Sequence, residues 1–147
     1  MEGKIENNEA SYFYLNLISY LKKYQPQLAG DLKFIQQRID NAGQIFDSFR
    51  QAGYDVNFSI EKANEELFKD LEFSPYSLII DIIEENYEHI PAVKRRELSI
   101  KFISDCIEVV RKYGENYYEL EGSIQWLIMI EVIGIIEIHL ENNGLLQ

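Results

Sequence analysis

The 147-residue sequence contains few of the residue types that mark disulfide-rich, metal-binding or redox domains. It has one cysteine (Cys106), three prolines, one tryptophan and two histidines. A single cysteine excludes an internal disulfide and leaves no thiol cluster for a metal or redox site. A free cysteine usually behaves as a small buried hydrophobe, so we predict that Cys106 lies in the core.

Basic residues are missing from the last quarter of the chain. Residues 115–147 contain six acids and no lysine or arginine, whereas the first 114 residues contain 19 acids and 14 bases. More than half of the formal net charge of −11 is therefore carried by the C-terminal end. A surface of this sign repels phosphate backbones and anionic membranes, so we expect neither direct nucleic-acid binding nor membrane binding.

Signatures of common enzymes and of exported proteins are also missing. The sequence has no phosphate-binding glycine loop, no nucleophile elbow, no glycine-rich dinucleotide turn and no metalloprotease histidine pair. This argues only weakly against an enzyme, because an active site can assemble from scattered residues. Residues 1–9 lack the basic region and apolar core of a signal peptide, so we expect a cytoplasmic protein.

The most informative segment that is present runs from Ser123 to Glu141 and is apolar on nearly every side of a helix. A helix that is hydrophobic all round is either buried or membrane-spanning. Glu131, Gly134, Glu137 and His139 interrupt it too often for a span, which needs about 20 mostly apolar residues. We therefore predict a compact, soluble, all-α bundle of about six helices, built around a buried C-terminal helix.

Glycine, proline and capping residues divide the chain into these helices. No alternating strand pattern longer than four residues occurs, and no internal repeat is visible. A chain of this length is one domain by the usual prior, so we predict a flexible segment over residues 1–8 and a single helical domain over residues 9–147. The expected starts lie at Asn8, Asp31, Ser59, Ser74-Pro75, Pro91 and Ser123, and the expected stops at Tyr24, Gly53, Leu71, Tyr87, Gly114 and Gly144.

The glutamates Glu131, Glu137 and Glu141 fall within about 80° of one another on the last predicted helix. They form either a narrow solvent-facing seam or a carboxylate row facing a cleft, as in acid–base or di-metal chemistry. The di-iron template fails, because Glu137 and His139 are two residues apart instead of three. Apolar residues flank Glu131 on both sides, so we predict that it is buried. A buried carboxylate needs a partner, such as a tyrosine hydroxyl or an arginine from another helix.

His89 is the one histidine with an acid at helical spacing, since Glu85 precedes it by four residues. One such pair provides too few ligands for a structural zinc. We therefore predict no metal site, and we expect His89 to interact with a helix end, where a cation is favoured.

Two short segments are candidates for binding a partner. Lys94, Arg95 and Arg96 form the only basic cluster, which either pairs with the acids just upstream or provides a docking patch for an acidic partner. Tyr117 and Tyr118 belong to ten tyrosines, which combine apolar area with a polar tip and are typical of interaction surfaces as well as of cores.

Many loop glycines, caps and core aromatics occur in an order and spacing typical of one bacterial family. They cover most of residues 11–80 and 126–145, whereas residues 84–125 depart from the pattern. The matching residues are Ser11, Tyr12, Phe13, Leu15, Ser19, Tyr20, Leu21, Pro26, Leu28, Ala29, Gly30, Asp31, Phe34, Ile35, Arg38, Asp40, Ala42, Gly53, Tyr54, Val56, Leu71, Phe73, Ser74, Tyr76, Ile79, Glu131, Gly134, Ile136, Ile138, Leu140, Glu141, Gly144 and Leu145.

With these residues the chain resembles the family called domain of unknown function 1896, which is of Bacteroidetes type. The resemblance implies an all-helical fold and a gene often found near conjugative or other mobile elements, and it implies no known activity. Arg38, Asp40 and Glu131 are the polar exceptions among the matching positions. We therefore take Glu131, Arg38, Asp40 and Tyr12 as candidates for buried polar residues, with Arg38 or Tyr12 satisfying Glu131.

Three functions are compatible with these observations. The favoured one is a non-catalytic helical accessory module that docks another protein or a second copy of itself, with no catalytic residue and no cofactor. The second is an acidic decoy that occupies a nucleic-acid-binding protein, which needs an exposed row of carboxylates about 7 Å apart, matching alternate phosphates. The third is a small enzyme with a pocket centred on Glu131.

Overall fold

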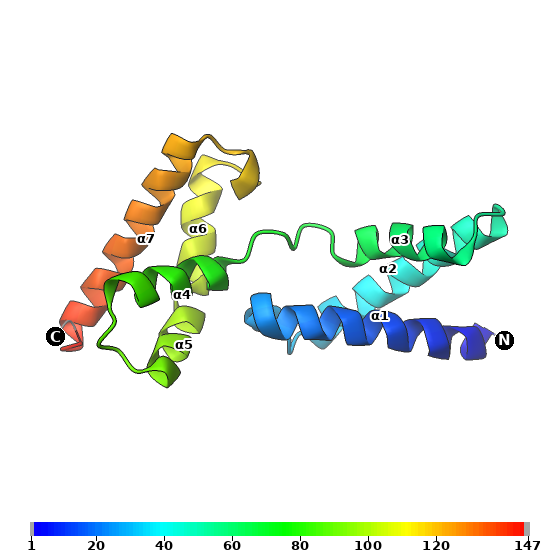
Figure 1. Ribbon diagram of the computed structural model, residues 1–147, viewed down its shortest axis with the longest axis horizontal. Helices are drawn as coiled ribbons and strands as arrows, with labels where there is room; N and C mark the ends of the chain where they lie inside the picture. The colour runs from blue at the N-terminus through cyan, green and yellow to red at the C-terminus, as the bar shows by residue number, and fades with distance from the viewer. Residues whose placement is uncertain (1, 146–147) are drawn as a thin grey trace. The chain divides into compact units, whose positions relative to one another are not determined.

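The computed structural model describes residues 2–145, and side chains from Glu9 onward. The described part of the chain contains helices and no strand, which confirms the predicted all-α class. The elements are α1 (Glu2–Tyr24), η1 (Pro26–Leu28), α2 (Leu32–Gln51), α3 (Val56–Leu67), α4 (Pro75–Asn86), α5 (Ala92–Lys101), α6 (Ile103–Tyr113), η2 (Tyr117–Glu119) and α7 (Gly122–Asn142) (Figure 1).

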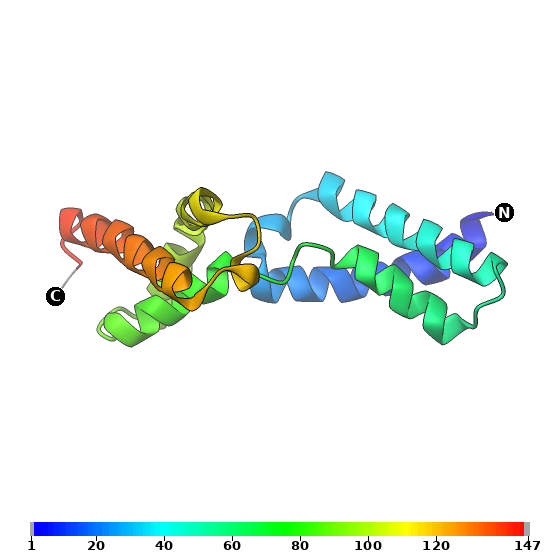
Figure 2. The same cartoon turned by 90° about the horizontal axis from the view of Figure 1, so that it is seen from above.

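Contacts divide the chain into two compact units, residues 1–72 and residues 73–147. The first contains α1–α3 and the second α4–α7, and each unit encloses its own hydrophobic core (Figures 1 and 2). The prediction that the last helix is the hub of all the others was therefore wrong, because the core of α1–α3 contains no residue of α7. The single folding domain over residues 9–147 stays a prediction, since two cores can still unfold together.

Several predicted helix boundaries are confirmed by capping contacts. Asp31 accepts a hydrogen bond from the Phe34 amide at 3.1 Å and caps α2. Gly53, with a φ of 98°, follows this helix in the left-handed region that favours glycine. Ser74 accepts from an amide in the first turn of α4 at 3.0 Å, and Pro75 occupies the first helical position.

Other boundaries differ from prediction. α1 begins at Glu2, so Asn8 lies within this helix and is not its cap. α3 begins before Ser59, because the Asp55 carboxylate accepts from the Phe58 amide at 2.8 Å and caps the helix there. The predicted helix after Pro91 is two helices, α5 and α6, which meet at Phe102. This break raises the number of α-helices in the described residues from six to seven.

The first unit is held together by apolar packing of α2 against α1 and α3 and by one polar anchor. The buried Gln25 donates from Nε2 to the Leu71 carbonyl at 3.0 Å, and the Tyr20 hydroxyl donates to the same oxygen at 2.7 Å. These bonds tie the segment after α3 to the end of α1. The core consists of Phe13, Leu17, Leu21, Ile35, Ile39, Ala42, Phe46, Ala63, Leu67 and Leu71.

In the second unit the apolar stripe of α5 and α6 is not continuous. Val93 and Ile100, which lie at apolar positions of α5, are 74% and 40% exposed. Phe102 is buried and leaves helical geometry at φ −93° and ψ 4°, so the inward face changes at this residue. Leu98 and Cys106 lie in the core on either side of the break.

Burial of α7 is one-sided, which corrects the prediction that the whole helix is buried. Side chains spaced by four residues form a stripe in the core, while large apolar side chains on the other side are exposed. The buried stripe is Ile128, Val132, Ile136 and Leu140, each at most 2% exposed; the exposed side chains are Trp126 (57%), Leu127 (41%), Ile130 (45%) and Ile138 (61%).

The end of α7 is fixed by contacts that follow it. Gly144 has a φ of 67°, and the Leu145 amide donates to the Leu140 carbonyl at 2.8 Å. Leu145 packs against the second core. His89 follows α4, and its Nε2 is 2.8 Å from the Leu145 carbonyl oxygen. It interacts with a helix end, but with that of α7.

Among the described helices, α7 is the one that is long and apolar enough, by length and composition, to cross a membrane. Core helices of soluble proteins pass the same test, and α7 contributes a stripe to the second core. The buried share of the apolar window is 22%. A soluble protein with a cytoplasmic location stays a prediction.

Matched substitutions on α7 test its one-sided burial. Ile136→Ala should lower the free energy of unfolding by about 2–5 kcal/mol, because it removes buried methylenes and leaves a cavity. Ile138→Ala, the same change on the exposed side, should alter it by about 0.5 kcal/mol or less. Urea denaturation followed by circular dichroism measures both. Similar losses in the two variants would contradict one-sided burial.

Candidate protein-interaction site

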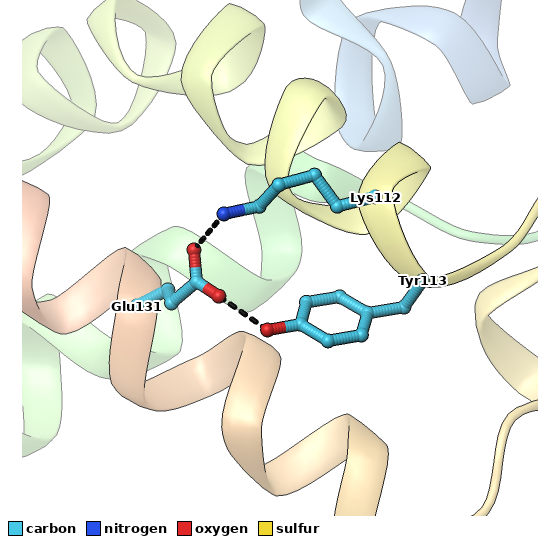
Figure 3. Close-up of polar contacts among 3 residues, drawn as sticks. All are labelled: Lys112, Tyr113 and Glu131. Carbon is cyan, nitrogen blue, oxygen red and sulfur yellow. Dashed lines mark hydrogen bonds and ion pairs between the residues drawn. The ribbon is translucent and has the colours of Figure 1, made fainter.

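Glu131 lies at the contact between α6 and α7, where two side chains from the last turn of α6 bind it (Figure 3). Lys112 Nζ is 2.5 Å from Oε1, and the Tyr113 hydroxyl donates to Oε2. Glu131 is partly exposed, with a third of its side chain accessible (33%). The prediction that it is buried was therefore wrong, and its partners are Lys112 and Tyr113 instead of Arg38 or Tyr12.

Ionisation in this cluster favours the charged carboxylate. The hydrogen bond from Lys112, and then that from Tyr113, lower the pKa of Glu131. The hydrogen bond to Glu131 raises the pKa of Lys112, and likewise that of Tyr113. A carboxylate held ionised, with both oxygens bound, is poorly suited to act as a general acid.

The other candidates for buried polar residues have roles within the first unit. Arg38 is partly buried, donates to the Leu67 carbonyl at 2.9 Å at the end of α3, and lies over the Phe34 ring. Asp40 is exposed and accepts from Gln36, and Tyr12 is 42% exposed. Burial of Asp40 and Tyr12 was therefore predicted wrongly.

The fully buried polar residues were missed by sequence reasoning. Gln25 donates a hydrogen bond to the Leu71 carbonyl, as described above. Ser59 and Ser99 donate to the carbonyl oxygens of Asp55 and Arg95, one helical turn earlier. Serine at these positions has no sequence signal of its own, because a hydroxyl that bonds within its own helix can lie in a core.

The basic cluster is engaged locally, though not with the acids that we expected. Arg95 donates to the carbonyl oxygens of Ile90 at 2.7 Å and Glu88 at 2.9 Å. Arg96 donates to the Tyr76 hydroxyl at 3.1 Å. Lys94 pairs at 3.7 Å with Glu97, one turn along the same helix.

Tyr117 and Tyr118 form an aromatic group with Phe73 at the start of the second unit. The rings of Phe73 and Tyr117 are stacked at 4.5 Å, which leaves Tyr117 partly buried. Tyr118 is 59% exposed and meets Phe73 edge-on at 6.1 Å. Of the predicted partner-binding residues, Tyr118 is thus the most accessible aromatic side chain.

Two features bear on cofactor and metal binding. Among the described residues no group of three or more His, Cys, Asp or Glu side chains could hold a metal ion. An open surface depression of about 380 Å³ lies in the first unit, and Glu131 does not line it. Its lining residues are Ala10, Ser11, Tyr14, Leu15, Gln36 and Ile39.

Among the residues whose side chains the structure describes, the largest group of exposed apolar side chains on one helix belongs to α7. We call Trp126, Leu127, Ile130 and Ile138 the exposed α7 face. Gly134 lies among them on the helical wheel, and a Cβ added there would meet no atom within 4 Å. A glycine inside a helix costs about 1 kcal/mol relative to alanine, and packing within the chain does not require it here.

A family model for the domain of unknown function (DUF1896) matches residues 5–145. The chain belongs to this family, and the match runs through residues 84–125, which we had expected to depart from its pattern. The chain is similar in fold to protein PG0816 from Porphyromonas gingivalis, known from a crystal structure. Their TM-score is 0.80 and their sequence identity 23%, over 97% of each chain. No curated protein matches the chain.

The stability of the second unit should depend on pH through Glu131. A carboxyl group with a lowered pKa stabilises the folded state above its unfolded value of 4.5, and this contribution is lost as the pH falls through the folded pKa. Lys112, with a raised pKa, contributes below its unfolded value of 10.5 and loses this as the pH rises through the folded pKa. Glu131→Gln should therefore be less stable than the wild type between these limits.

Denaturation at a series of pH values measures this difference, which should disappear at low pH. Glu108→Gln removes an exposed acid elsewhere on α6 and provides the control. A difference between wild type and Glu131→Gln that persists unchanged at low pH would contradict the role of the ionised carboxylate.

The single thiol should be unreactive in the folded protein. Cys106 is fully buried, as predicted, and burial, with a smaller effect of Asp105, raises its pKa to about 12. We expect a thiol reagent such as Ellman's reagent to label it only as fast as the second unit opens, with the rate rising steeply in urea. Rapid labelling in buffer would show that this core is open.

Proposed function

We propose that the chain is a non-catalytic helical module that binds another protein through the exposed α7 face. The single observation that carries this proposal is the group of four large apolar side chains on one helix, each between 41% and 61% exposed. Exposed apolar patches are a recognised mark of protein-interaction sites. An accessory role in the cytoplasm, beside mobile genetic elements, is the setting that we propose.

The size of the face sets a limit on affinity. Complete burial of such a side chain contributes about 1.5–3 kcal/mol, so the exposed halves of four side chains offer about 4 kcal/mol. A complex with micromolar affinity needs about 8 kcal/mol. A partner must therefore gain the rest from contacts around the face.

The two other functions receive less support. A Glu131-centred enzyme is disfavoured because Lys112 and Tyr113 occupy both carboxylate oxygens. An acidic decoy needs a row of free carboxylates. Glu131 is instead paired with Lys112, while Glu137 and Glu141 share a side of α7 with the apolar residues of the exposed face.

A capture experiment from an extract of the native host tests the proposal. The wild-type chain should retain a protein partner, and the double variant Trp126→Ser/Ile138→Ser should lose it, because the change removes the two most exposed side chains of the face. Val93→Ser, which replaces a 74% exposed side chain on α5, should retain the partner.

Thermal melts that match the wild type establish that both variants are folded. Retention of the same partner by the double variant would contradict the proposed site. A chain that retains no partner, by mass spectrometry of the eluate, would contradict the proposed function.

A further inference from the structure

The exposed α7 face has the dimensions of a helix-binding surface. Trp126, Ile130, Gly134 and Ile138 follow one another at intervals of four along one side of the helix, with Leu127 beside them. Trp126 to Ile138 span about 18 Å at 1.5 Å per residue. Gly134 lies near the middle of this strip and presents no side chain. A partner backbone can approach α7 most closely there, as small residues allow at helix–helix contacts.

The charges on the same side of α7 are all negative. Glu137 and Glu141 are exposed, and neither takes part in an ion pair among the described residues. Glu137 lies beside the Tyr87 hydroxyl, whose pKa is raised by burial and then by this carboxylate. The side chain of Glu137 nevertheless remains exposed to solvent.

In the described part of the chain no lysine or arginine forms an ion pair with these carboxylates. Residues 115–147 contain no lysine or arginine, and Lys112, the nearest base in sequence, is bound to Glu131. We infer that the exposed α7 face binds an amphipathic helix whose apolar stripe is flanked by lysine or arginine. Such a helix matches both the apolar strip and the charge beside it.

Two other occupants fit these charges less well. A second copy of the chain has no lysine or arginine on its own α7 that could pair with Glu137 and Glu141. Lipid-binding amphipathic helices carry lysine and arginine on their polar side, whereas this side of α7 carries only acids.

Trp126 gives a direct readout, because it is the only tryptophan in the chain and lies on the face. The probe is a synthetic helical peptide of about 18 residues, without tryptophan, with leucine at i, i+3, i+4 and i+7 and lysine or arginine on the flanks. We expect it to shift Trp126 emission to shorter wavelength in a saturable manner, with an affinity that falls as salt is added.

Two control peptides separate charge from shape. One keeps the leucine stripe but carries glutamate on its flanks, and the other keeps the basic composition in scrambled order. Each should bind at least about tenfold more weakly than the probe. Equal affinity for the acid-flanked peptide, or for the scrambled one, would overturn the inference.

Matched variants locate the contact on the protein. Glu141→Gln should weaken binding of the basic peptide about two- to fivefold, as expected for loss of one exposed ion pair. Glu119→Gln, which removes an exposed acid from η2, should leave it unchanged. Equal effects of the two substitutions would contradict a docked helix and indicate general attraction by net charge.

The inference rests on the proposed function, but the two can fail separately. Loss of the native partner by the double variant together with no binding of the basic peptide would overturn only the inference. A short-wavelength emission of dilute protein, or a shift that grows with protein concentration alone, would show that the chain itself or a second copy covers the face. Either result would overturn the inference.

Discussion

The other helices of the second unit cover α7 on one side only. Both the core of this unit and its exposed apolar surface follow from this constraint. The helix has 21 residues and supplies four of the most deeply buried side chains of the second core. Its opposite side is nearly as apolar, yet its large side chains are 41% to 61% exposed. The sequence that makes the helix a strong core element therefore also leaves a hydrophobic strip in water. Glu131 lies at the boundary between the buried stripe and the exposed side of α7, where two side chains of α6 bind its carboxylate (Figure 3).

The sequence allowed the helical class and most boundaries to be predicted, because caps and glycine stops act locally. A cap or a glycine stop depends only on the backbone next to it, so its role can be inferred without tertiary information. This holds for Asp31, Gly53, Ser74 and Gly144. Errors arose where two signals competed. Asp55 and Ser59 are both good caps four residues apart, and the earlier one is used.

The side of α7 that is buried could not be predicted. A helix that is apolar all round has no preferred direction of burial in its sequence, so the buried side is decided by the shape of the other helices.

The partners of the basic cluster could not be predicted either, because they also depend on the folded backbone. Arg95 lies close in sequence to three glutamates, yet it binds backbone carbonyls, because the turn after α4 presents those oxygens and the carboxylates extend into solvent. The burial of Gln25 and Ser99 could not be predicted, because their hydrogen bonds to backbone carbonyls form only in the folded chain.

The break at Phe102 has a consequence for how the second unit forms. It leaves α5 with 10 residues and α6 with 11, each shorter than the roughly 12–15 residues that an isolated helix needs in water. Neither segment has enough intrinsic helicity to persist alone, so the helical structure of both depends on tertiary packing. α5 packs against α4, and α6 packs against α4 and α7, so loss of either neighbour should unwind these two short helices as well.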